Sequence, residues 1–382
     1  MGTTFKNLNQ NEDVRTVKTK IHEVIPLTGS IISGTYGTHP NEANIRTYTH
    51  GMFQGVYDYP YLSSSANHIF DLSFGTWPAG IYGQEDKISS DPGQKTEKQN
   101  IYTQMAQILV GHDVSGNIKA FDHLGDLTSS KGQKMHSAFF MPLSRLLVKD
   151  EIQKESFKMV VGTSSIDHPE GVFGDGIKTI RDLNANSAFK NNSPAGEYGI
   201  LYVGDTVSDD KAVGLIFYQA GVAVLELSGA WGNGSQDLFN QHESGAFAQK
   251  KGTEAPTRQF FSSSALTSLN FSQSVGTCSI DQMCGAFRRR IKSVEFRNVT
   301  EINSTVYFCR ANHNEFNYST NPTYTTGSKI RVKDVKDDAP VSYVTSVGLY
   351  SSDNVMVASA KLSEPLKKSP NTDFTIRVRL DY

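Results

Sequence analysis

The chain has 382 residues, with 37 basic and 39 acidic side chains and a formal net charge of −2. This near balance argues against a nucleic-acid-binding protein, which usually carries an excess of basic charge. The length allows two or three domains, each with its own core.

Composition also bears on the fold. The chain contains 32 glycines, 16 tyrosines and 21 phenylalanines, a mixture typical of many short strands joined by turns. We therefore predict a mainly β fold with antiparallel sheets and a few short helices.

Three features concern the cellular compartment. The chain has three cysteines, Cys278, Cys284 and Cys309. This number is too small for a disulfide framework, and it is odd, so that not all three could pair. No apolar run reaches the ~18 residues of a membrane helix. The N-terminus has no apolar core of a signal peptide. These features predict synthesis in a reducing cytoplasm and no membrane partner.

The first predicted elements lie near the N-terminus. Residues 1–20 are polar and lack periodicity, so we expect an extended N-terminal arm of the kind that orders against a neighbouring subunit. Residues 21–287 follow as a β-rich N-terminal and middle region. Alternating apolar residues over 21–36, with Gly29 and Gly34, predict a strand, a turn and a second strand.

The best helix candidate lies near 97–110. Ile101, Met105, Ile108 and Leu109 fall on one helical face, and Gly111 ends the pattern.

The middle of the chain contains the clearest strands. Residues 198–203, 213–218 and 222–227 are apolar almost throughout, which predicts strands buried on both faces. Residues 170–196 are rich in Gly, Asn and Asp and are expected to form a loop. A short helix is expected over 280–287.

Residues 288–382 are predicted to form a β-sandwich-like domain. The expected strands are 293–297, 305–311, 329–333, 342–350, 355–362 and 373–380. The last has the cleanest alternation, with Phe374, Ile376, Val378 and Leu380 toward a core and Thr375, Arg377 and Arg379 outward.

Motifs for catalysis are missing from the sequence. There is no Gly-x-Ser-x-Gly elbow, no phosphate-binding loop and no His-Glu-x-x-His. Cys278, Cys284, Cys309 and His313 can be drawn as a zinc site, but small buried thiols are the commoner outcome. We assign no catalytic, cofactor-binding or metal-binding residue and expect that the chain is not an enzyme.

Three other groups of residues leave alternatives open. The basic run Arg288–Arg290 with Lys292 could meet phosphate, although a solvated strand edge or a salt-bridged interface is favoured. The pairs Asp209–Asp210 and Asp337–Asp338 are expected in solvated turns, with a calcium site as the alternative.

The third group is the aromatic stretch 48–74. It is interpreted as core or subunit interface, with a carbohydrate platform as the alternative. Its members are Tyr48, Phe53, Tyr57, Tyr59, Tyr61, Phe70 and Phe74.

Several stretches resemble virion structural proteins of large contractile-tailed bacteriophages. They are residues 312–322, 347–350, 358–366 and 374–382, together with 21–29, 50–54, 57–65 and 214–221. The likeness consists of short sequence segments at both ends and in the middle of the chain, and it includes no active-site motif.

The resemblance implies a tail or baseplate protein, with the neck as a further position. It implies a location in the virion, after assembly in the host bacterial cytoplasm. The implied partners are other virion proteins (tail tube, sheath, baseplate or neck components) and copies of the chain itself, in six-fold or multiple symmetry. No cofactor and no nucleic acid are implied. A receptor- or glycan-binding tail module and a glycan-degrading tail enzyme are the alternative functions.

Overall fold

The structure is a computed structural model that describes residues 5–28, 42–80, 82, 94–127, 134–162, 173, 177–226, 275–319, 325–326, 329–330 and 340–382. The chain forms two compact units. Unit 1 comprises Met1–Lys20 and Glu301–Tyr382, and unit 2 comprises Ile21–Thr300. The fold is mainly β with short helices, as the composition predicted.

This division differs from the predicted domain boundaries. Residues 1–20, expected as a separate arm, belong to the same unit as residues 301–382. The expected boundary between 287 and 288 lies instead at residue 300. The reason is β13 (Ile291–Ala311), one strand of 21 residues where two separate strands were predicted. Both β13 and β1 (Val14–Thr28) contribute residues to the two units.

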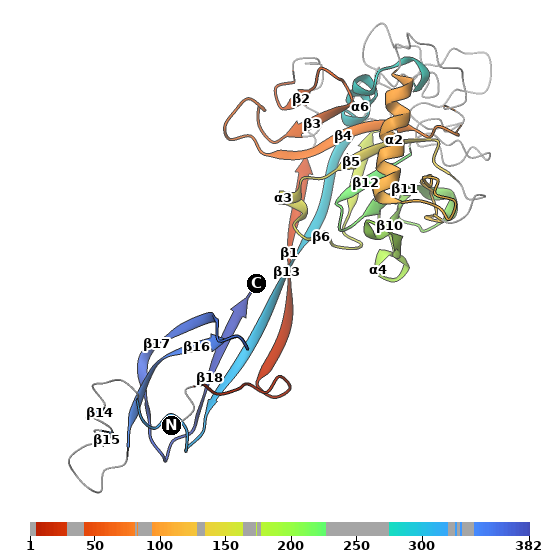
Figure 1. The fold of residues 1–382 in the computed structure, drawn as a ribbon. Coiled ribbons are helices and arrows are strands. Elements are labelled where there is room, and N and C mark those ends of the chain that lie inside the picture. The colour runs from red at the N-terminus through yellow and green to blue at the C-terminus, as the bar shows by residue number, and fades with distance from the viewer. Residues whose placement is uncertain are drawn as a thin grey trace, which may run out of the picture. The chain divides into compact units, whose positions relative to one another are not determined.

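Unit 2 is built on an antiparallel sheet with the strand order β13-β7-β8-β10-β11-β12-β5-β4-β3-β2 (Figure 1). The strands that follow β1 are β2 (Ile45–Thr47), β3 (Phe53–Tyr57), β4 (His68–Thr76), β5 (Ser137–Pro142), β7 (Lys158–Gly162), β8 (Ile177–Arg181), β10 (Gly196–Val203), β11 (Ala212–Phe217) and β12 (Val222–Leu225). Two short strands join this sheet at its sides: β6 (Glu151–Ile152) pairs with β13, and β9 (Lys190–Ser193) pairs with β10.

The central strands confirm the prediction of burial on both faces. Every residue of β11 and β12 is buried. For β10 the prediction holds only in part, because Ile200 and Val203 are half-buried. The turn expected at Asp209–Asp210 contains the short 3-10 helix η2 (Asp209–Lys211).

The loop predicted over 170–196 is wrong for its described part. That stretch contains β8, the one-turn helix α4 (Ala185–Ala188) and β9. Its Gly, Asn and Asp content is typical of a loop, and the short strands have few apolar residues that could indicate them. One of these few is Ile180 in β8, which is fully buried.

Two hydrophobic clusters lie on opposite faces of the sheet, because consecutive strand residues alternate between them. Phe139 belongs to one cluster and Phe140 to the other. Helix α6 (Ile280–Arg288) packs on the first face, where Phe287 contacts Phe139 at a ring-centroid distance of 4.6 Å. Helix α2 (Lys95–Leu109) covers the second face through Tyr102, Ala106 and Leu109. The short helix α3 (Arg145–Val148) follows β5.

Helix α2 confirms the helix expected near 97–110, and Gly111 follows its end with a φ of 82°. The predicted buried face was partly wrong, since Ile108 is 66% exposed and Tyr102 is buried instead. The tyrosine hydroxyl donates a hydrogen bond to the backbone oxygen of Met135 at 2.7 Å and accepts one from the backbone N–H of Phe121 at 3.1 Å. These bonds let an aromatic ring with a polar end fill the interior.

The helix predicted over 280–287 is confirmed as α6, and its start is set by a capping box. The Ser279 hydroxyl oxygen accepts from the backbone N–H of Gln282, and the Gln282 side chain accepts from the backbone N–H of Ser279.

In unit 1, β1 and β18 (Phe374–Asp381) both pair with β13 (Figure 1). A separate two-stranded sheet is the hairpin of β16 (Ser342–Tyr350) and β17 (Met356–Lys368). A further small pair is formed by β14 (Thr325–Thr326) and β15 (Lys329–Ile330).

Strand β18 confirms the predicted alternation. Thr375, Arg377 and Arg379 are exposed, whereas the four apolar residues are more covered. Of these four, however, only Val378 is buried.

Candidate interaction surface of unit 1

Unit 1 buries very few apolar side chains. Among its described residues the buried hydrophobic ones are Val306, Ala311, Leu349 and Val378. Both hydrophobic core clusters consist of unit 2 residues. The described part of unit 1 therefore has a small interior and lacks most of the apolar burial that stabilises domains of similar length.

The hairpin β16–β17 is the most exposed part of this unit. Only Ser342 and Leu349 of β16, and only Lys368 of the 13-residue β17, are buried. Large apolar side chains stay in solvent at the turn and along the strands: Tyr343, Tyr350, Val355, Met356, Val357 and Leu366. Val357 is 67% exposed and Tyr343 61%. A two-stranded ribbon that exposes both faces is marginally stable alone, and exposed apolar surface of this kind marks interaction sites.

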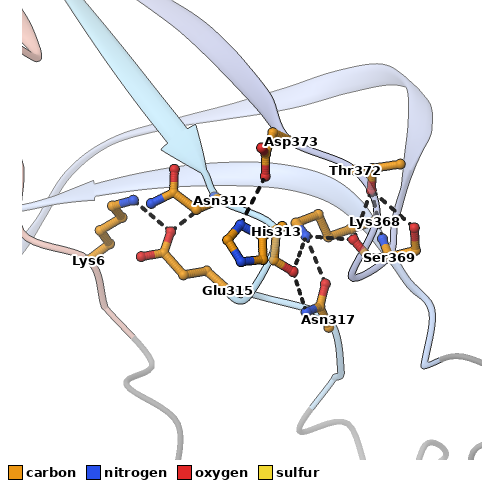
Figure 2. Close-up of polar contacts among 9 residues, drawn as sticks. All are labelled: Lys6, Asn312, His313, Glu315, Asn317, Lys368, Ser369, Thr372 and Asp373. Carbon is orange, nitrogen blue, oxygen red and sulfur yellow. Dashed lines mark hydrogen bonds and ion pairs between the residues drawn. The ribbon is translucent and has the colours of Figure 1, made fainter.

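The base of the hairpin is held by one buried lysine (Figure 2). Lys368 has no exposed surface, and its Nζ donates to the backbone oxygens of His313 and Ser369, at 3.2 and 2.8 Å, and to Oδ1 of Asn317, at 2.7 Å. The side chain thus ties the loop after β13 to the loop between β17 and β18. Hydrogen bonds from a charged donor are stronger than neutral ones, which makes Lys368 the main polar anchor of this end of unit 1.

Both loops also carry bonds of their own. The Asn317 amide donates to the backbone oxygen of His313 at 2.7 Å, and the Thr372 hydroxyl donates to the backbone oxygen of Ser369 at 3.0 Å. His313 and Asp373 approach to 3.9 Å, but both side chains are about two-thirds exposed, so this contact contributes little to stability.

The N-terminal segment packs on unit 1 of the same chain. Lys6 forms an ion pair with Glu315 at 2.6 Å (Figure 2), and the Phe5 ring meets the Tyr350 ring edge-on at 5.0 Å. The backbone N–H of Phe308 donates to the backbone oxygen of Asp13 at 2.8 Å. The segment predicted to order against a neighbouring subunit therefore has binding partners within its own chain.

The basic run is buried, which contradicts the predicted solvated strand edge. Arg288, Arg289 and Arg290 are at most 7% exposed, and the run begins in α6. Arg288 and Arg289 both pair with the buried carboxylate of Glu42. Gln54 accepts from Arg288 at 3.3 Å. Burial lowers the pKa of Arg288, while the Glu42 carboxylate raises it. The arginines therefore lie in the interior of unit 2, where they are not accessible to a phosphate group in solution.

The cysteines do not form a metal site with other residues in the described part of the chain. There, no group of three or more His, Cys, Asp or Glu side chains is placed to hold a metal ion. Cys278 and Cys284 are buried in unit 2, and burial raises the pKa of Cys284 well above its ordinary value. Asp209 lies in η2, in the predicted turn. Asp337 and Asp338 lie outside the described residues.

The aromatic stretch 48–74 divides into two parts. Phe70 and Phe74 are fully buried in the core of unit 2. Tyr59 is 60% exposed and Tyr61 is also exposed, whereas Tyr57 is half-buried between the Tyr61 and His68 rings. The interpretation as core holds for the part on β4, whereas Tyr59 and Tyr61 are exposed to solvent.

Sequence reasoning missed a buried polar cluster in unit 2. His123 contacts the Glu226 carboxylate through Nε2, and both residues are 2% exposed. Glu226 also accepts from the backbone N–H groups of His136 and Ser137, at 2.9 and 3.1 Å. Burial lowers the pKa of His123 well below its ordinary value. The cluster joins distant segments of the sheet, and its burial separates it from any substrate in solution. Its members are spread over 103 positions, so no local motif indicates it.

Comparisons with known protein families, characterised proteins and solved structures give no match to this chain. Within the described residues, no helix is both long and apolar enough to cross a membrane.

Proposed function

We propose that this chain is a structural component of a bacteriophage virion, a tail or baseplate protein with the neck as a further position, and that it acts without catalysis. The observation that carries the assembly role is the exposed β16–β17 hairpin in a unit that buries only four apolar residues among those described. The link to a phage rests on the resemblance of residues 312–322 and the C-terminal stretches.

Subunit assembly would complete what the isolated unit lacks. Exposed strands pair readily with strands of other chains, and exposed apolar side chains gain stability when a partner covers them. In the proposed role, copies of the chain form a symmetric ring of six or a multiple of six, and its loops and strands join that ring to tube, sheath, baseplate or neck proteins.

Quantitative peptide mass spectrometry of purified tailed phage particles tests the proposal. We expect peptides of this chain in particles, at an amount comparable with other tail proteins and resistant to washing with salt. Its absence from particles in which the tail proteins are detected would refute the virion assignment.

A second candidate function, a receptor- or glycan-binding tail module, is favoured by the exposed tyrosines of the 57–61 loop. Tyrosine rings stack on sugar faces, and Tyr59 and Tyr61 leave such faces in solvent. Binding of host surface polysaccharide that is lost in Tyr59→Ala would support this function. Release of new reducing ends from the same polysaccharide would instead indicate a glycan-degrading enzyme.

A further inference from the structure

The strands of unit 1 differ in how their free edges are protected. Sheet proteins guard exposed edges against pairing with charged side chains and prolines. Strand β1 carries Arg15, Lys18 and Lys20 within this unit, β17 carries Lys361, Glu364, Pro365 and Lys367, and β18 carries Arg377, Arg379 and Asp381. Strand β16, with the sequence SYVTSVGLY, contains neither a charge nor a proline.

Strand β16 also has an edge available for pairing. It pairs with β17 on one side, and no other strand of the described residues pairs with it. Five of its nine residues are exposed, among them Tyr343, Thr345 and Ser346. The strand therefore presents unpaired backbone N–H and C=O groups next to uncharged side chains, the arrangement that favours pairing with another strand.

We propose that β16 pairs antiparallel with β16 of a second copy of this chain, which rests on and deepens the proposed assembly role: the contact joins copies in pairs, and six such pairs would form a ring with a multiple of six copies. Such a contact is isologous, because the same strand is used by both copies. Among β1, β16, β17 and β18, only β16 can pair with its own copy without placing a charged strand residue opposite the partner strand, and this holds in every register. Pairing of β1 with its own copy would place lysines or arginines close together, which is unfavourable, and pairing of β17 or β18 with its own copy would do so in some registers.

The apolar surface beside β16 is suited to the same contact. Tyr350 lies at the end of β16 and pairs with Met356 of β17, and Val355 and Val357 flank that methionine. All four side chains are exposed. They extend the uncharged surface from the strand edge to the hairpin turn, so that a second copy would bury apolar area in addition to forming backbone hydrogen bonds.

Sedimentation velocity of the full chain over a range of concentrations tests the proposal, with two variants of equal added charge. Thr345→Lys/Ser346→Lys places four positive charges at the two-fold contact, because each substitution occurs in both copies. Ser359→Lys/Ser363→Lys adds the same charge to exposed positions of β17. We expect the wild type and the β17 variant to dimerise. The β16 variant should bind its copy at least about tenfold more weakly, because like charges oppose association.

Hydrogen exchange of the wild type gives a readout that does not depend on folding of the variants. Backbone amides of residues 342–350 should exchange more slowly as the concentration rises into the dimeric range. A wild type that stays monomeric, a β16 variant that dimerises normally, or concentration-dependent protection confined to β1, β17 or β18 would each overturn the proposal. These outcomes are independent of whether the chain occurs in phage particles, so the two proposals can fail separately.

Discussion

Replacement of Lys368 by methionine should loosen the base of the exposed hairpin without unfolding unit 2. Methionine keeps most of the side-chain volume but removes the ammonium group that joins three oxygens. The backbone oxygens of His313 and Ser369 keep other hydrogen bonds, from the Asn317 amide and the Thr372 hydroxyl. The Asn317 Oδ1 loses its bond from the ammonium. Asn317 is half-buried, and the loss of a hydrogen bond from a charged donor costs about 1–3 kcal/mol.

Hydrogen exchange with peptide resolution is the suitable assay for unit 1, and the fluorescence of Trp77, which lies in unit 2, gives a separate readout of that unit. A local loss of about 1–3 kcal/mol predicts exchange about 5- to 150-fold faster in residues 312–319 and 369–373. The tryptophan fluorescence transition in urea should not move.

The matched control is Lys367→Met, which removes the same charge from an exposed neighbouring position. Unchanged exchange in Lys368→Met, or equal acceleration in both variants, would refute the anchoring role of Lys368.

Three further predictions concern unit 2 and use its tryptophan fluorescence in urea. Glu42→Gln should cost about 3–5 kcal/mol, because it leaves the buried arginines Arg288 and Arg289 without their carboxylate; a loss below about 1 kcal/mol would contradict the buried ion pair. Leu109→Ala should lower the free energy of unfolding by about 2–5 kcal/mol and Ile108→Ala by less than about 1 kcal/mol. A larger loss in Ile108→Ala than in Leu109→Ala would contradict the observed burial of α2. Burial raises the pKa of Asp182 to about 7 from its ordinary value of 3.8. The folded state therefore holds this proton more tightly, and the stability it contributes below about pH 4 is lost as the pH rises through about 7. Asp182→Asn should reduce that decline between about pH 4 and 7, and an unchanged pH profile would contradict the raised pKa.

Local sequence pattern predicted much of this fold. A short helix was expected over 280–287, where α6 lies, the apolar spacing near 97–110 indicated α2, and strands β10, β11, β12, β16 and β18 were expected close to their observed bounds. These elements have strong local signals, because a strand or helix that is buried on a regular face repeats its apolar residues at a fixed period.

Features that depend on distant residues could not be predicted in this way. Ile108 matched the helical period of α2, but the hydrogen bonds of Tyr102 to Met135 and Phe121 decide which face is buried. The run Arg288–Arg290 was expected at a solvated strand edge or a salt-bridged interface, and its burial against Glu42 was not predicted, because Glu42 precedes it by 246 positions, counted from Arg288. Lys368 gave no signal, since its neighbour Lys367 has the same chemistry and is exposed.

The position of the chain in a phage particle tests the central claim most directly. A cryo-electron microscopy map of intact tailed particles, with the chain located by a bound antibody fragment, would show both its place and its copy number. The proposed function predicts label around the tail axis, at the baseplate, tail or neck, in six copies or a multiple of six. Label on the capsid alone would contradict the proposed function. So would particles that bind no antibody fragment, provided that the denatured particle proteins do not bind it either.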